Sequence, residues 1–151
     1  MKTLILIRHA NALAAYEAGV QTDAERPLSD EGFQKAAYTA QALAVQKIKP
    51  DIILTSPLLR AVQTAETIAQ ILPAHVSKET VLNGLYDEQA VRDFLTDQLA
   101  EHDTVAAVGH NPNISYLTHL LVKEVYHFSP GSFAVLNMTD LQAPRLTFFG
   151  E

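Results

Sequence analysis

Three short apolar runs, separated by segments with helical periodicity, constrain the fold of this chain more than any other feature. The runs are Leu4–Ile7, Ile52–Leu54 and Val105–Val108. Continuous apolar runs flanked by helical patterns are typical of parallel strands that are buried on both faces. Strands that alternate with helices favour right-handed crossovers, with helices on both sides of one sheet. The sequence therefore predicts an α/β fold, a three-layer α/β/α sandwich around a mostly parallel sheet.

Periodicity and turn residues also predict where the individual elements lie. Residues 9–28 are expected to form a polar loop. Ser29 is expected to cap a helix, and Pro57 and Pro112 are each expected at the first position of a helix. Strands are predicted at about 3–8, 51–55, 75–78, 104–109, 132–138 and 145–149, and helices at about 30–47, 57–71, 88–101 and 112–122.

Length and composition narrow the class of protein. The chain has 151 residues and shows no repeat or linker, so residues 1–151 are expected to form one domain. A net charge of -6 argues against a general nucleic-acid binder. The chain has no cysteine, which excludes disulfides and a thiol nucleophile. Because it opens directly into a strand and has no long apolar run, we expect a cytoplasmic protein with no membrane partner.

Basic residues follow each of the three apolar runs. Arg8 and His9 come after the first run, Arg60 follows the second, and His110 follows the third. Ligands of open parallel sheets bind beyond the carboxyl ends of the strands, so these side chains are expected along one rim. Two histidines and two arginines on one rim can hold an anion the size of a phosphate.

Each of these residues also has a simpler explanation. His9 could be only a hydrogen-bonded residue at a strand end. Arg60 could be a solvated surface residue, but a cation in the first turn of a helix is disfavoured by the helix dipole unless an anion lies beside it. Ala10 is small, so its backbone amide can approach a ligand. Asn111 could cap the helix that follows it, or form a simple turn with His110 as a spectator.

Taken in order, the motifs resemble the histidine phosphatase superfamily, which has the phosphoglycerate-mutase-like fold. They are Arg8-His9-Ala10, Ser56-Pro57…Arg60-Ala61…Gln63-Thr64-Ala65-Glu66 and Gly109-His110-Asn111-Pro112. The segment Arg26-Pro27-Leu28-Ser29…Gly32 and the short chain are most similar to the SixA-like branch, which is named for a phosphohistidine phosphatase. The resemblance spans about residues 3–120. It implies a phosphatase that forms a covalent phosphohistidine intermediate, acts on protein phosphohistidine, and uses no metal or other cofactor.

The resemblance also implies roles for particular residues. His9 would be the nucleophile, Arg8 and Arg60 would hold the phosphoryl oxygens, and His110 would complete the pocket. The substrate-binding positions that it implies are Arg26, Asn111 and Ala10. A neutral imidazole is a competent nucleophile near pH 7, and planar guanidinium groups suit a phosphoryl group.

Two positions depart from the family pattern. Ala10 stands where most members have glycine. Many members have a glutamate acid after the third strand, and here the candidates are Asp87 and Glu88, which also suit a helix N-terminus. If no acid is supplied, the substrate should carry a good leaving group, and phosphohistidine does because its imidazole can be protonated near neutral pH. Short loops after the first and third strands predict no large cap, and therefore an open pocket.

Three other functions remain open from the sequence. A phosphatase or mutase for small phosphorylated metabolites would need an enclosed pocket and a usable acid. A phosphate-binding regulatory module without turnover would have no need of the two histidines. A metallohydrolase is disfavoured because nearby arginines would repel a cation. We expect the partner to be a phosphorylated protein or a small phosphorylated metabolite.

Overall fold

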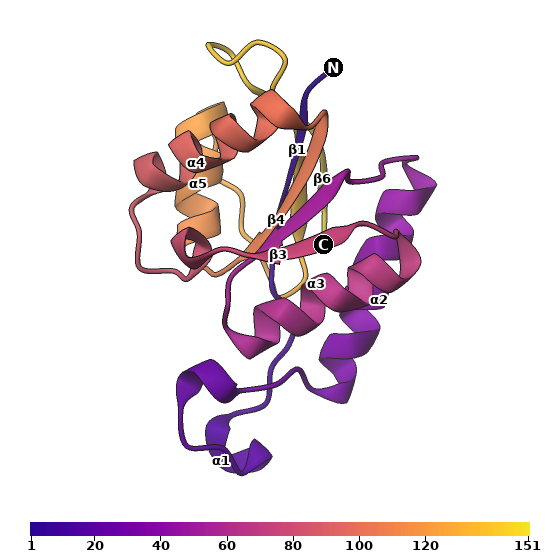
Figure 1. Cartoon of the computed structure of the whole chain (residues 1–151), viewed down its shortest axis with the longest axis vertical. Coiled ribbons are helices and arrows are strands. Elements are labelled where there is room, and N and C mark those ends of the chain that lie inside the picture. Colours follow the sequence, from indigo (N-terminus) through magenta and orange to yellow (C-terminus); the bar gives the residue numbers. More distant parts are fainter.

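A six-stranded sheet forms the centre of the computed structural model, which describes residues 1–151 (Figure 1). The strand order is β3-β2-β4-β1-β5-β6. The parallel strands are β1 (Thr3–Arg8), β2 (Ile52–Thr55), β3 (His75–Lys78) and β4 (Thr104–Gly109), and the antiparallel ones are β5 (Phe133–Asn137) and β6 (Arg145–Gly150). The predicted α/β class with a mostly parallel sheet is confirmed.

Helices cover both faces of this sheet and complete the three layers (Figure 1). One pair is α2 (Asp30–Val45) and α3 (Leu59–Ile71), and the other pair is α4 (Glu88–Glu101) and α5 (Asn113–Val122). The length and apolarity that a bilayer-crossing helix requires are not found in any of them. A 3₁₀ turn, η2 (Thr80–Leu82), lies between β3 and α4.

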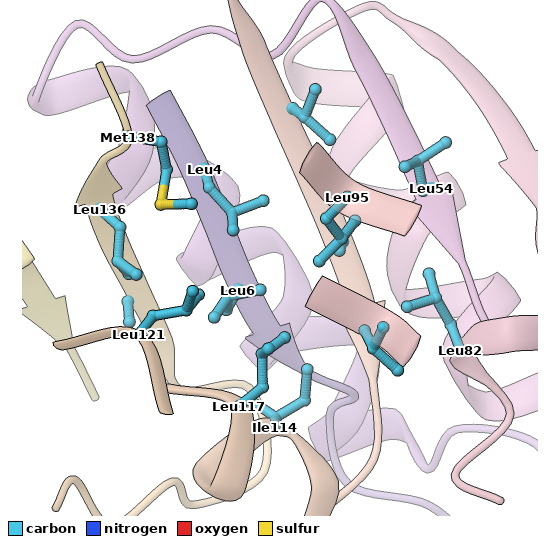
Figure 2. Packing of buried hydrophobic residues seen from close by; sticks show 14 of the residues in the cluster. Leu4, Leu6, Leu54, Leu82, Leu95, Ile114, Leu117, Leu121, Leu136 and Met138 are labelled. Atoms are coloured by element: carbon cyan, nitrogen blue, oxygen red, sulfur yellow. The ribbon is translucent and has the colours of Figure 1, made fainter. Parts of the chain in front are cut away.

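The central strand β1 is apolar from Leu4 to Ile7 because it contributes to two cores. Leu4 and Leu6 pack in a cluster with α4 and α5 side chains such as Leu95 and Leu117 (Figure 2). The alternating residues Ile5 and Ile7 pack on the opposite face, against α2 and α3. Alternate residues of a strand point to opposite faces, so a strand between two helical layers needs apolar residues at every position.

The start of α2 follows the prediction and packs against the segment that leaves β1. Ser29 caps the helix, because its Oγ accepts a hydrogen bond from the Gly32 amide at 3.1 Å. A Cβ at Gly32 would lie 2.0 Å from the Asn11 carbonyl oxygen. Only glycine therefore allows this close approach of the two backbones.

The two helices expected to begin at proline begin later. Helix α3 starts at Leu59 and α5 at Asn113, so Pro57 and Pro112 precede the first helical residue. Before α3, the Ser56 hydroxyl accepts a hydrogen bond from the Leu58 amide at 3.2 Å and holds a turn ahead of the helix. These prolines therefore shape the approach to each helix.

The prediction of a polar loop throughout residues 9–28 was wrong. This segment contains a short helix α1 (Ala15–Ala18), a 3₁₀ turn η1 (Asp23–Glu25) and a bridge between Ala12 and Leu28. In Figure 1 it lies beyond the end of the sheet at which β1 finishes. Elements of three or four residues are too short to show hydrophobic periodicity, which is why the sequence did not reveal them.

Replacing Leu6 by alanine should lower the free energy of unfolding by about 2–5 kcal/mol, because a cavity would remain in the packed core. Leu6 is 0% exposed, whereas Leu141 is 51% exposed, so Leu141→Ala is the control. That control should change the free energy by less than about 0.5 kcal/mol. Urea unfolding measures both values, and similar losses in the two variants would contradict the packing described.

Candidate active site

Two histidines meet where β1 and β4 end. The strands pair in parallel with Arg8 opposite Gly109, so His9 and His110 leave the sheet side by side. Their ring centroids are 5.1 Å apart. The same cleft is lined by Arg8, Arg26 and Arg60. The structure thus brings together the four residues assigned to catalysis, together with Arg26.

One hydrogen bond orients the His9 ring. Its Nδ1 lies 2.7 Å from the Ala10 carbonyl oxygen. Because a carbonyl can only accept, Nδ1 carries the proton of the neutral ring and Nε2 keeps the free lone pair. Burial, together with the positive charges of the nearby arginines, lowers the pKa of His9 to about 4 against the opposing effect of the Ala10 bond. The ring is therefore neutral at pH 7, with Nε2 available as a nucleophile.

The second histidine is held by a buried serine. His110 Nε2 lies 2.8 Å from Ser56 Oγ, and Ser56 is fully buried just after β2. Burial, together with the proximity of His9 and Arg60, lowers the pKa of His110 to about 3 against the opposing charge of Asp23. His110 is therefore also neutral at pH 7. Ser56 was named in the sequence only as part of the motif that contains Arg60, and its contact with His110 was not predicted.

The three arginines are anchored by the backbone but keep free donors. Their bonds to carbonyl oxygens, each 2.8 Å, are Arg8 Nη1 to Phe128, Arg26 Nε to Leu13, and Arg60 Nη1 to Asp23. The Nε atoms of Arg8 and Arg60 are buried and have no hydrogen-bond partner. A buried donor without a partner costs about 1–3 kcal/mol. Both guanidinium groups line the cleft and therefore keep hydrogen-bonding capacity beside it.

A carboxylate already lies between two of these arginines. Asp23 Oδ1 accepts a hydrogen bond from Arg26 Nη1, and Oδ2 accepts one from Arg60 Nη2, both at 3.0 Å. Hydrogen bonds from Arg26 and then Arg60 lower the pKa of Asp23, so its carboxylate is ionised at neutral pH. The anion expected beside Arg60 in the first turn of α3 is thus an internal one. Asp23 was not predicted, and its only signal in the sequence is its spacing of three residues from Arg26.

Ala10, the small residue after His9, makes a structural contact in place of the expected contact with a ligand. Ala10 is fully buried, and its amide donates to Thr64 Oγ1 at 3.1 Å. Thr64 donates in turn to the Arg60 carbonyl at 2.8 Å. The expectation that this amide approaches a ligand does not fit the structure, because Thr64 already accepts from it. The contact instead ties the end of β1 to α3.

Asn111 lines the cleft, while its side chain holds the start of α5. Its Oδ1 accepts hydrogen bonds from the Ser115 amide at 3.2 Å and the Ser115 hydroxyl at 2.8 Å. Its Nδ2 donates to the Phe128 carbonyl at 3.4 Å. The N-cap residue of α5 is Pro112 and not Asn111 as one sequence interpretation expected, but the Asn111 side chain still accepts from an amide of the first turn, and Asn111 lines the cleft at the same time.

Neither acidic residue considered as a proton donor lines the cleft, although Glu88 lines an adjoining pocket that includes His110. Asp87 caps α4 and accepts from the Ala90 amide at 2.8 Å, and Glu88 begins that helix. Asp23 is the only acidic residue that lines the cleft. Nowhere in the chain are three or more histidine, aspartate or glutamate side chains grouped to hold a metal ion.

Comparisons with known proteins agree with this geometry. The family model of the histidine phosphatase superfamily (branch 1) matches residues 4–85. The phosphohistidine phosphatase SixA of Escherichia coli K12 is 32% identical over 119 residues, which are 76% of this chain and 70% of that protein. The chain therefore belongs to the histidine phosphatase superfamily, a family of hydrolases, and its phosphatase activity follows from that membership. By sequence it is a homologue of SixA.

Two solved structures share the fold. The protein histidine phosphatase SixA complexed with tungstate has a TM-score of 0.89, with 24% identity over 99% of this chain and 96% of that one. A mycobacterial glucosyl-3-phosphoglycerate phosphatase complexed with VO3 has a TM-score of 0.77, with 18% identity over 99% of each chain. At these identities the two structures establish the architecture alone, and one fold evidently serves different substrates.

Acidification should destabilise the protein through its two neutral histidines. An unfolded histidine titrates near pH 6.5, whereas the pKa of His9 is about 4 and that of His110 about 3. Between these pKa values the unfolded chain binds more protons than the folded one. The stability that the two neutral histidines contribute is therefore complete above pH 6.5 and is lost as the pH falls. When the pH is lowered from 7 to about 4.5, the free energy of unfolding of His110→Gln should fall by about 2 kcal/mol less than that of the unmodified protein.

Urea unfolding at the two pH values tests this expectation. His75 is exposed on the edge strand β3, so His75→Gln should follow the unmodified protein. Equal pH-dependent losses in His110→Gln and the unmodified protein would show that His110 is not held neutral by burial.

Proposed function

We propose that this chain is a phosphatase for phosphohistidine in proteins and works through a transient phosphoryl group on His9. One observation carries the choice of substrate: the only acidic side chain of the cleft, Asp23, is an ionised carboxylate bonded to two arginines. An alkoxide leaving group needs a proton from an enzyme acid. The imidazole of phosphohistidine needs none, because near neutral pH its other ring nitrogen already carries a proton.

In the first step, the lone pair of His9 Nε2 attacks phosphorus. The bond between phosphorus and the substrate nitrogen breaks, and its electron pair stays on that nitrogen, so the protonated ring leaves as neutral imidazole. In the second step, water attacks the phosphoryl group on His9, the pair of the breaking bond returns to Nε2, and dihydrogen phosphate departs with both protons of the water. The Ala10 carbonyl holds Nδ1 and its proton through both steps.

The other residues of the cleft stabilise the phosphoryl group in this proposal. Arg8 and Arg60 offer buried Nε donors without partners, and Arg26 adds a third guanidinium group. Fixed donors around the transferring group supply most of what phosphoryl transfer requires from a protein. His110, held by Ser56, completes the pocket, and Asn111 keeps the following turn in place.

An open cleft supports a protein as the bearer of the phosphoryl group. Leu85 lines the cleft and is 87% exposed, which suits contact with another macromolecule. The segments that border the cleft contain only short elements, α1, η1 and η2, and no inserted domain covers it. We therefore propose that residues 1–151 act as one domain without a cap.

The covalent intermediate can be trapped and located. Rapid acid-free quenching with a radiolabelled substrate should yield a label on His9 that is stable in alkali and labile in acid. His9→Ala should remove the label and lower kcat by at least about a thousandfold, because the nucleophile is lost. His75→Ala, at an exposed histidine, should retain both. A label on another residue, or full turnover by His9→Ala, would contradict the assignment.

Substrate preference provides the test of the proposed function. A small protein phosphorylated on a surface histidine should be hydrolysed with a kcat/KM at least about a hundredfold above that of an alkyl phosphate, since the cleft supplies no general acid. Activity should persist with a chelator and fail with vanadate. Comparable rates on both substrates would point to a phosphatase for small esters. Transfer to an acceptor would indicate a mutase, and binding without turnover a regulatory module.

A further inference from the structure

We propose that Asp23 sets the leaving-group preference of the cleft by pairing with a positively charged leaving group. This inference rests on the proposed function, because a phosphorylated imidazole is the phosphoryl donor whose leaving group carries a positive charge near neutral pH. It assigns to Asp23 a task beyond holding two arginines in place.

The position of Asp23 places its charge at the mouth of the cleft. The exposed side-chain fraction rises from 9% for Arg60 to 29% for Arg26 and 64% for Asp23. A phosphoryl group that reaches the free Nε donors and the His9 ring must lie on the inner side. The remainder of the substrate then extends outward, past the exposed carboxylate.

The carboxylate also keeps capacity for a further bond. Each oxygen of Asp23 accepts one hydrogen bond from an arginine side chain. An ionised carboxylate has about four acceptor positions, so each oxygen can accept another N–H. No lysine or additional arginine lines the cleft. Apart from the two arginines already bonded to it, Arg26 and Arg60, no side-chain cation would therefore compete with a cationic N–H of the substrate for the carboxylate.

Charge changes during the reaction determine which kinetic constant should report this pairing. A phosphorylated imidazolium begins with a positive ring and releases a neutral one, whereas an aryl phosphate begins with a neutral ring and releases an anion. In both reactions the leaving group becomes more negative by one charge, and the nearby carboxylate disfavours this change equally in the two cases. It therefore gives the imidazolium no advantage in the bond-breaking step. The advantage arises in binding, where the carboxylate attracts the cationic ring. KM should therefore respond more than kcat.

Binding of simple anions such as inorganic phosphate distinguishes this role of Asp23 from a purely structural one. If Asp23 only oriented Arg26 and Arg60, its removal would weaken binding of every phosphate. If it acts through its charge, its removal frees guanidinium donors and eliminates repulsion, so inorganic phosphate should bind more tightly.

The experiment compares Asp23→Asn with the unmodified protein at about pH 6, where an imidazole is largely protonated. N-phosphoimidazole and p-nitrophenyl phosphate are the substrates, and inorganic phosphate is the inhibitor. For Asp23→Asn, KM for N-phosphoimidazole should rise about five- to tenfold, as expected for loss of a partly exposed ion pair. KM for p-nitrophenyl phosphate and the inhibition constant of phosphate should fall.

Asp97→Asn is the matched control, because Asp97 is exposed on α4 and the substitution removes the same charge away from the cleft. It should leave all three constants unchanged. Weaker binding of both substrates and of phosphate in Asp23→Asn, or an unchanged ratio of the two KM values, would overturn the inference. If the unmodified protein hydrolyses N-phosphoimidazole no better than an alkyl phosphate, the proposed function itself fails; if it prefers N-phosphoimidazole to p-nitrophenyl phosphate and Asp23→Asn retains that preference, only the role of Asp23 is refuted.

Discussion

Parallel pairing of β1 with β4 is the constraint on which the site depends. Both strands are buried on their two faces, and Leu4–Ile7 and Val105–Val108 are 0% exposed. A slip of one residue would turn every side chain of a strand to the opposite helical layer, so packing fixes the register. That register sets His9 beside His110. The same apolar residues that stabilise the core therefore determine the spacing of the two imidazole rings, and the site needs no separate framework.

The cleft concentrates groups that are unfavourable in the protein alone. Two histidines are kept neutral by burial and by nearby positive charge, and two guanidinium groups have buried donors without partners. Such an arrangement lowers stability, but it leaves donors in place for an anion before the anion arrives. Asp23 offsets part of this cost by accepting from Arg26 and Arg60. Binding of a phosphoryl group would offset more of it, because every additional acceptor meets a donor that is already oriented.

The sequence revealed the parts of this molecule that depend on local pattern. Apolar runs predicted the buried strands, and their positions predicted that His9 and His110 would share one rim. It did not reveal contacts between residues distant in the chain, such as Ser56 with His110 or Thr64 with Ala10, because neither hydroxyl differs locally from an ordinary helix or turn residue. The use of the Ala10 amide was likewise misjudged, since a small residue indicates room for approach but does not identify what approaches.

The charge of the cleft connects its architecture to its chemistry. Three guanidinium groups and one carboxylate, that of Asp23, give the cleft a net charge of +2 when both histidines are neutral. In the proposed reaction this charge suits a phosphoryl group with two negative charges, and Asp23, as an ionised carboxylate, has no proton to give to the leaving group. A protonated imidazole would bring its own proton, with a positive charge that the exposed carboxylate can attract. The arginine pairs that keep Asp23 ionised make it a poor acid, and by the same interaction they preserve the negative charge that a cationic leaving group would meet.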